Sequence, residues 1–167
     1  MKTPLLPALL LAAVLGFAPG SAPAGVVRPA PNFAWGPGKT LQSWRGQPVV
    51  LLIAPSPRSK AFRKQAARIQ ASYQDFAARN TVFVAAFTEP DGTSIPYSNR
   101  VASNVPFVLA ANGAQIAASY GFNGEITVAV IGKDGNLDLN SGKIVPASQI
   151  MDMIYNNFEQ QTAERKL

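Results

Sequence analysis

The stretch VVLLIAPSPRSKAF (residues 49–62) decides the fold class of this chain. It begins with an unbroken run of valine, leucine and isoleucine, which is typical of a strand buried on both faces of a parallel sheet. Two prolines, Pro55 and Pro57, then end the strand, and Ser59 has the side chain of a helix N-cap. We therefore predict a buried strand over 48–54 that leads through a short loop into a helix.

The residues that follow complete a strand-helix-strand unit. Apolar side chains recur at steps of three and four, which predicts one amphipathic helix over 60–79. Its apolar face would be formed by Phe62, Ala66, Ile69, Tyr73 and Phe76. A second apolar run, TVFVAAF (81–87), predicts a second buried strand, and the connection makes the two strands parallel neighbours.

The second half of the chain carries a hairpin and a terminal helix. The strand-like segments 125–131 and 136–139 flank Gly-Lys-Asp-Gly at 132–135, a sequence that favours a tight hairpin turn. Apolar residues at helical spacing predict a terminal helix over 146–158, and a weaker pattern suggests a short helix over 115–120.

The N-terminus has the pattern of a secretory signal peptide. Lys2 precedes an apolar run over 5–17, and Ala22-Pro23-Ala24 has the small residues of a cleavage site. We predict that residues 1–24 are removed and that the protein is periplasmic or secreted, without stable membrane insertion. The expected organisation of the remainder is an extended lead-in, one domain and a polar tail, at residues 25–38, 39–158 and 159–167.

Composition excludes much catalytic chemistry. The 167 residues include no cysteine and no histidine. Without cysteine the chain cannot perform thiol-disulfide exchange or thiol peroxidase reactions. Without both residue types it lacks the usual nucleophile, the usual general base near neutral pH and the usual transition-metal ligands. We therefore predict no metal, no cofactor and a non-catalytic role, and the net charge of +6 favours acidic partners.

Two segments resemble thioredoxins and peroxiredoxins. The stretch 49–62 resembles the segment in which a strand ends in Ala-Pro-like residues before the redox loop, and YGFNGEITVAVIGKDGNL (120–137) resembles the later strand and Asp-Gly turn. This resemblance implies a thioredoxin-like three-layer α/β/α fold, whose central mixed sheet contains a βαβ unit, a C-terminal β-hairpin and a terminal helix. It also implies that the two redox cysteine positions fall on Pro57 and Lys60, and the cis-proline position on Ile126.

With these signatures lost together, the sequence resembles a cysteine-free bacterial family known as domain of unknown function 4174. That family is similar in turn to a domain at the end of sushi-repeat-containing extracellular proteins of animals. The resemblance covers about residues 40–158, and its most specific part is the run Ile-Gly-Lys-Asp-Gly at 131–135. Asp138 and Asn140 depart from the family pattern, which has basic residues there. The resemblance implies a thioredoxin-like module whose redox site has been replaced.

Basic residues gather where the redox loop would meet the first helix. Five cations lie within eleven residues, with no acidic residue before Asp75: Arg58, Lys60, Arg63, Lys64 and Arg68. A helix N-terminus already carries partial positive charge, so each nearby cation is disfavoured by ~0.3–1 kcal/mol and a bound anion would relieve the repulsion. A solvated helix face explains the same pattern. The candidate site for an anion or a protein partner is Ser56, Arg58, Ser59, Lys60, Arg63 and Lys64.

The function that these patterns favour is an exported non-redox binding module. Nucleic acid is not an expected partner, because no aromatic residues are interleaved with the cations to stack on bases. Two alternatives remain open: an envelope enzyme that uses the carboxylates Glu89, Asp91 and Glu125, and a purely structural component of the cell surface.

Two further patterns have ordinary explanations as well. Trp35, Trp44 and Tyr97 would suit a surface groove, but packing in the core or the lead-in explains them equally. Acidic and amide residues alternate between 134 and 140, yet an EF-hand loop needs glycine and a carboxylate where this chain has Leu139 and Val145. The alternation instead predicts the solvent face of a strand.

Overall fold

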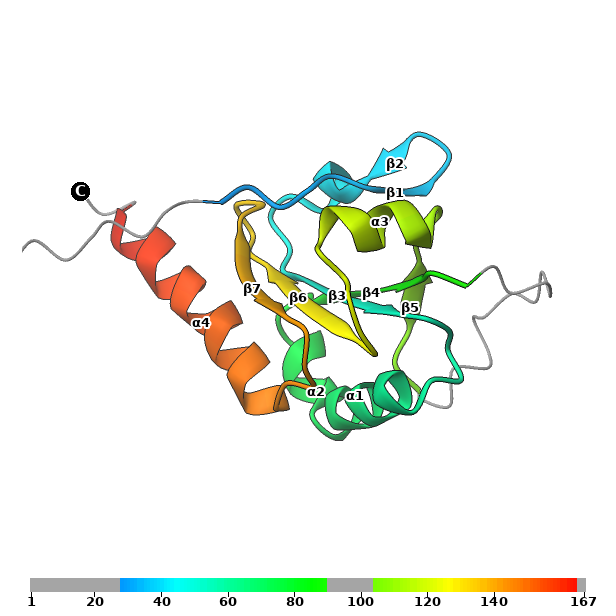
Figure 1. Ribbon diagram of the computed structural model, residues 1–167. Coiled ribbons are helices and arrows are strands. Elements are labelled where there is room, and N and C mark those ends of the chain that lie inside the picture. The colour runs from blue at the N-terminus through cyan, green and yellow to red at the C-terminus, as the bar shows by residue number, and fades with distance from the viewer. Residues whose placement is uncertain (1–27, 90–103, 165–167) are drawn as a thin grey trace, which may run out of the picture.

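The computed structural model describes residues 28–89 and 104–164, so the predicted signal peptide lies outside the described residues. Within these ranges five strands form a mixed sheet in the order β5-β4-β3-β6-β7 (Figure 1). The strands are β3 (Val49–Ala54), β4 (Val82–Phe87), β5 (Phe107–Leu109), β6 (Thr127–Ile131) and β7 (Leu137–Ser141). Strands β3, β4 and β5 are parallel, whereas β6 and β7 are antiparallel to their neighbours. The predicted α/β fold with its central mixed sheet is confirmed.

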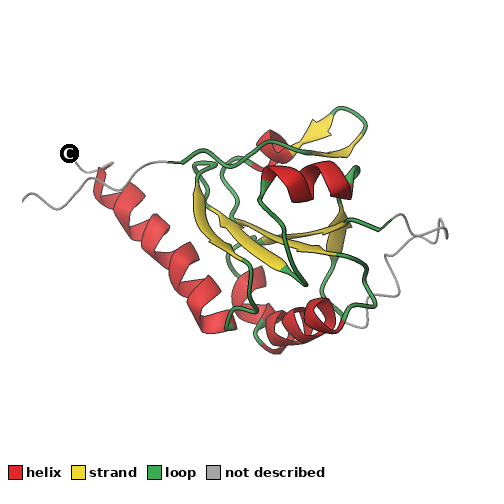
Figure 2. Cartoon of the chain, in the orientation of Figure 1, coloured by secondary structure: helices red, strands yellow, loops and turns green. Residues whose placement is uncertain are grey.

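Helices cover both faces of this sheet (Figure 2). They are α1 (Lys60–Ala71), α2 (Tyr73–Ala77), α3 (Gly113–Ser119) and α4 (Ala147–Glu164). Residues of α1, α2 and α4 share one buried cluster, and residues of α3 belong to a second cluster on the opposite face. A small hairpin, β1 (Ala34–Gly36) and β2 (Lys39–Thr40), and the 3-10 turn η1 (Leu41–Trp44) lie on the α3 side. The result is three layers, with the sheet in the middle.

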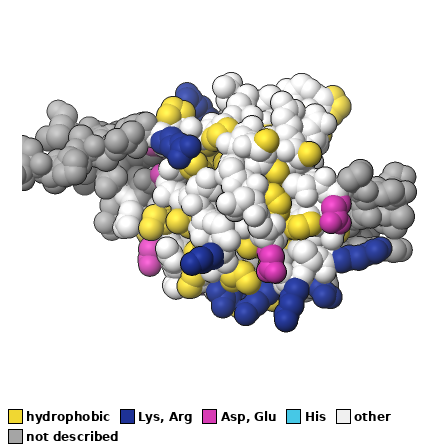
Figure 3. Space-filling view, in the orientation of Figure 1, with side chains coloured by type: hydrophobic (Ala, Val, Ile, Leu, Met, Phe, Trp, Pro, Cys, Tyr) yellow, Lys and Arg dark blue, Asp and Glu magenta, His cyan; other side chains and the backbone are white. Residues whose placement is uncertain are grey.

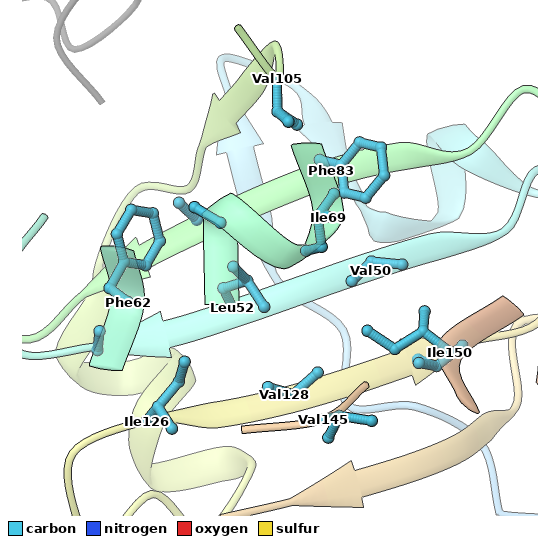
Figure 4. Close-up of a cluster of buried hydrophobic side chains, with 14 of the residues drawn as sticks. Val50, Leu52, Phe62, Ile69, Phe83, Val105, Ile126, Val128, Val145 and Ile150 are labelled. Atoms are coloured by element: carbon cyan, nitrogen blue, oxygen red, sulfur yellow. The ribbon is translucent and has the colours of Figure 1, made fainter. Parts of the chain in front are cut away.

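Strand β3 explains why the apolar run decides the fold. None of its six residues is more than 1% exposed. Because side chains alternate across a sheet, Val50 and Leu52 pack toward α1 and α4 (Figure 4), while Leu51 and Ile53 pack toward α3. A strand that is central and covered on both faces requires apolar residues at every position.

The predicted helix over 60–79 is wrong in one respect, because the structure divides it. Helix α1 ends at Ala71, and Ser72 leaves the helical conformation before α2 begins. The Ser72 N–H donates to the carbonyls of Ile69 and Gln70, which closes α1 with a tight final turn. Tyr73 and Phe76 still pack against the same core as α1, so apolar spacing alone does not reveal the interruption.

Other element boundaries also differ from the prediction. Strand β5 was not predicted, since it comprises three half-buried residues directly after Pro106. Helix α3 begins two residues before the predicted start at 115, and α4 continues past 158 to Glu164. The extra residues of α4 are mostly Glu, Gln and Ala, which favour helix without any apolar pattern. None of the helices in the described ranges is long and apolar enough to cross a membrane.

A buried glutamine joins α1 to the segment before α4. Gln65 is fully buried, and its Nε2 donates to the Val145 carbonyl at 3.0 Å. In return, the Val145 N–H donates to Gln65 Oε1 at 2.8 Å. The side-chain amide thus pairs with this backbone as a neighbouring strand would, and it fixes the approach of α4 to α1.

The lead-in packs against the end of α3. Phe33 is buried and meets the Tyr120 ring edge-on, with ring centroids 6.3 Å apart. The Tyr120 hydroxyl donates to the Pro31 carbonyl at 2.8 Å, and burial raises the pKa of this phenol well above its ordinary value. Residues 29–33 are therefore anchored to the domain by an apolar contact and a hydrogen bond.

Candidate functional site

The predicted binding loop is a β-turn at the carboxyl end of β3. The Ser59 N–H donates to the Ser56 carbonyl at 3.1 Å, and Pro57 occupies the second turn position, which proline favours. Ser59 then caps α1, since its Oγ accepts a hydrogen bond from the Phe62 N–H at 3.3 Å. Pro57 is buried in this turn, whereas Arg58 is exposed.

Strand β4 holds the start of this loop in place. The Thr88 N–H donates to the Ala54 carbonyl at 3.1 Å, and the Glu89 N–H donates to the Pro55 carbonyl at 2.9 Å. The parallel pairing of β3 and β4 thus continues past the end of both strands. The turn that follows has a fixed starting point.

An apolar residue fills the place that the resemblance assigns to a cis-proline. Ile126 is 3% exposed and packs in the same cluster as Ala54, Ala61 and Phe62 (Figure 4). No cis peptide bond occurs within the described ranges. Of the two presumed cysteine positions, Pro57 is buried and Lys60 is exposed. Ile126, the residue before β6, therefore belongs to the core, Pro57 is buried in the loop, and no thiol is available.

The cations of this region are exposed and unpaired. We define the basic face as Arg58, Lys60, Arg63, Lys64 and Arg68. All five side chains are exposed, and none has an ion-pair or hydrogen-bond partner within the described part of the chain. Lys and Arg side chains gather along the α1 side of the molecule in the space-filling view (Figure 3). Helix α1 has no acidic residue in its first turn to offset them.

Backbone donors add to this positive surface. The N–H groups of Lys60 and Ala61, the first two residues of α1, have no acceptor in the described ranges. Such N–H groups at a helix start are suited to an anion. Ser59 Oγ already accepts a hydrogen bond, but its hydroxyl hydrogen remains able to donate.

The structure brings the predicted site residues together in one short segment. Ser56, Arg58, Ser59 and Lys60 lie on the turn and the helix start, and Arg63 and Lys64 lie within the first turns of α1. The two serines are half-buried. What the segment offers chemically is hydrogen-bond donation and positive charge.

The carboxylates considered for an enzyme are described only in part. Glu89 and Glu125 are exposed, and Asp91 lies outside the described residues. Among the described residues, no group of three or more acidic side chains has the arrangement of a metal site.

Sequence reasoning missed a pocket at the opposite end of the sheet. It has a volume of about 110 Å³ and is lined by residues of the lead-in, of the segment 41–49 and of the turn 132–135. Trp44, considered above for a groove, lines it and stacks on Trp35, with ring centroids 4.4 Å apart. Lys39 Nζ lies 4.8 Å from the Trp35 ring centroid. Because three segments that are distant in the sequence form this pocket, no local sequence pattern predicts it.

Solved structures similar to this chain are thioredoxin-like. A protein described as a putative thiol:disulfide interchange protein DsbE, from Chlorobium tepidum, matches with a TM-score of 0.63 and 18% identity, over 78% of this chain and 96% of that one. Peroxidoxin BcpB of Mycobacterium tuberculosis matches with a TM-score of 0.57 and 18% identity, over 80% and 96%. The mitochondrial 2-Cys peroxiredoxin of Plasmodium falciparum matches with a TM-score of 0.60 and 15% identity, over 83% and 97%.

These similarities define the class of fold. A scan against protein-family models finds no match, and a search of the curated proteins finds none either. The fold of this chain is thioredoxin-like, on a sequence that contains no cysteine.

Proposed function

We propose that this protein is an exported, non-redox binding module that holds an anionic ligand or an acidic protein surface at the carboxyl end of β3. The residues that would bind are Ser56, Arg58, Ser59, Lys60, Arg63 and Lys64. The observation that carries the proposal is the basic face itself: five exposed cations without a partner among the described residues, beside unpaired N–H groups of α1. Ligands of open α/β sheets bind beyond the carboxyl ends of strands, where this turn lies.

The electrostatics of α1 support an anion from outside the chain. Each cation near the helix start is disfavoured by ~0.3–1 kcal/mol at low ionic strength. A phosphate, a sulfate or a carboxylate in this place would accept hydrogen bonds from the Lys60 and Ala61 N–H groups and neutralise part of the repulsion. Cations that oppose the helix dipole without an internal partner are consistent with a ligand anion at this helix start.

Export and family membership belong to the same proposal. The order of Lys2, the apolar run 5–17 and the small residues at 22–24 supports removal of a signal peptide and a periplasmic or secreted location. The replacement of all three redox signatures, with Ile126 buried in the core, supports a place in the cysteine-free family known as domain of unknown function 4174.

The experiment is a thermal unfolding series at low ionic strength with phosphate, sulfate and polyglutamate. An anion at 100 times its Kd stabilises a protein by about 2.7 kcal/mol, which corresponds to a rise in Tm of about 5 °C or more for a domain of this size. The amide signals of Lys60 and Ala61 should shift in the same titration, and added sodium chloride should reduce both effects.

The matched variant replaces Arg58, Lys60, Arg63 and Lys64 with glutamine, and the control is Lys143→Gln, an exposed cation outside the basic face. The fourfold variant should lose the response and the control should keep it. If the wild type responds to none of these anions, or if the fourfold variant responds as strongly, the proposed function is wrong.

A further inference from the structure

The pocket near Trp44 is separate from the basic face. Its floor contains Val49, the first residue of β3, and Ile131, the last residue of the antiparallel neighbour β6. Ser56 follows the other end of β3. At about 3.3 Å per residue, the length of β3 alone places the two sites about 17 Å apart. We call this second site the amino-end pocket.

Backbone hydrogen bonds hold the walls of the amino-end pocket together. The Gly46 N–H donates to the Lys133 carbonyl at 2.9 Å, which ties the segment after η1 to the hairpin turn. The Ala30 N–H donates to the Gly135 carbonyl at 3.0 Å, which ties the lead-in to the same turn. The walls of the pocket are therefore in place before a ligand binds, and little binding free energy would be spent on ordering them.

The pocket has an apolar floor and a polar rim. Leu41, Val49 and Ile131 form buried apolar surface at its base. Four exposed polar residues also line it and are taken as its rim: Arg45, with a guanidinium, and Asn32, Gln42 and Gln47, each with a side-chain amide. These four rim side chains are exposed and have no partner within the described part of the chain.

Among the described residues, no carboxylate lines the amino-end pocket. Asp134, on the adjacent turn, directs its carboxylate to Asn136: one oxygen accepts from the Asn136 N–H at 3.0 Å and the other from Nδ2 at 2.6 Å. Arg45 is thus the single charged residue of the described ranges that lines the pocket, and it favours an anionic group at the rim.

The volume limits the ligand to a small molecule. About 110 Å³ is the space of three to four waters at about 30 Å³ each, and it is less than the roughly 150 Å³ cavity that holds benzene. A branched body of three or four carbons fits this space, with its charged end at the opening.

We propose that the amino-end pocket binds a small carboxylate with a compact apolar body. The carboxylate accepts hydrogen bonds from Arg45 and the rim amides, while the apolar body packs against Leu41, Val49 and Ile131. This site does not depend on the basic face, so each of the two proposals stands or fails without the other.

The test is a titration of the full chain with isobutyrate, followed by the amide signals of Gly132 and Gly135, which line the pocket. Isobutyramide, which has the same shape and no charge, is the comparison ligand. For so small a ligand we expect saturable shifts with a Kd of about 1 mM. Arg45→Gln should weaken binding about tenfold, and the same substitution at Arg58 on the basic face should leave it unchanged.

Every outcome of this titration decides the proposal. Saturable binding of isobutyrate that depends on Arg45 supports it. Equal binding of isobutyramide, full binding by Arg45→Gln, or no saturable shift at Gly132 and Gly135 overturns it. Arg45 is exposed, so the variant should fold, and circular dichroism verifies this. If Arg45→Gln does not fold, Gln42→Ala at the exposed rim replaces it, with a weaker expected loss of about threefold.

Discussion

Gln65 offers a sharp test of how this fold is held together. Replacing it with leucine keeps the volume of the side chain close to constant but removes both hydrogen bonds to Val145. Val145 is 3% exposed, so its N–H and carbonyl would lose their partners where water does not reach them. Each orphaned buried group costs about 1–3 kcal/mol. We expect a loss of about 2–5 kcal/mol, after the apolar gain of leucine offsets part of the sum.

The assay is urea unfolding followed by circular dichroism. A lower midpoint with an unchanged m-value would report a loss of stability without a change in the surface exposed on unfolding. Gln149→Leu is the matched control, because Gln149 is exposed on α4 and its side chain makes no hydrogen bond within the described part of the chain. That variant should lie within about 0.5 kcal/mol of the wild type.

A second variant, Gln65→Glu, separates the two hydrogen bonds by pH. A glutamate can accept from the Val145 N–H in either state, but only its protonated form can donate to the Val145 carbonyl. Folding should therefore raise its pKa above the ordinary value of about 4.3. The unfolded chain then releases its proton first as pH rises, so the stability of the variant relative to the wild type falls above about pH 4.3. A neutral or stabilising Gln65→Leu, or a pH-independent deficit in Gln65→Glu, would refute the reasoning.

The remaining predictions concern two close contacts on the α3 side. In Gly113→Ala the new Cβ would overlap the Phe87 carbonyl oxygen, so we expect the free energy of unfolding to fall by about 3 kcal/mol or more. The control is Gly124→Ala, whose new Cβ would have nothing within 4 Å, and it should be nearly neutral in the same unfolding assay. In Tyr120→Phe the hydrogen bond to Pro31 is lost, which should cost about 1 kcal/mol at neutral pH. Burial raises the pKa of the Tyr120 phenol, so the stability advantage of the wild type is fully present below about pH 10. Above about pH 10 the phenol of the unfolded chain ionises, and the advantage should shrink. A constant difference in unfolding free energy up to about pH 11 would contradict this.

Local patterns were sufficient to predict the centre of the fold. The run over 48–54 is apolar at every position because β3 is covered on both faces, and a buried central strand is the one place in a sheet with that requirement. The hairpin was equally readable, since Gly135 adopts a φ of 84° that favours glycine. Such signals are strong because each reports a constraint within a few residues.

Features that depend on distant partners were not predicted. Gln65 lies three residues after Phe62 and four before Ile69, so its spacing alone places it on the buried face of α1, but its polar side chain masked this position in the pattern. Its partner Val145 lies 80 residues away. The amino-end pocket has the same origin, because the lead-in, η1 and the hairpin turn meet only in the folded chain.

The candidate site at the start of α1 has an electrostatic logic that connects the fold to the proposed function. In redox proteins a cysteine at a helix N-terminus has a lowered pKa, because the partial positive charge there stabilises the thiolate. Here the helix start keeps its unpaired N–H groups, yet no residue in the first turn supplies a negative charge. Lys60, Arg63 and Lys64 increase the positive potential instead, so under the proposed function a ligand or a partner would supply the anion that a redox member of this fold carries within its own chain.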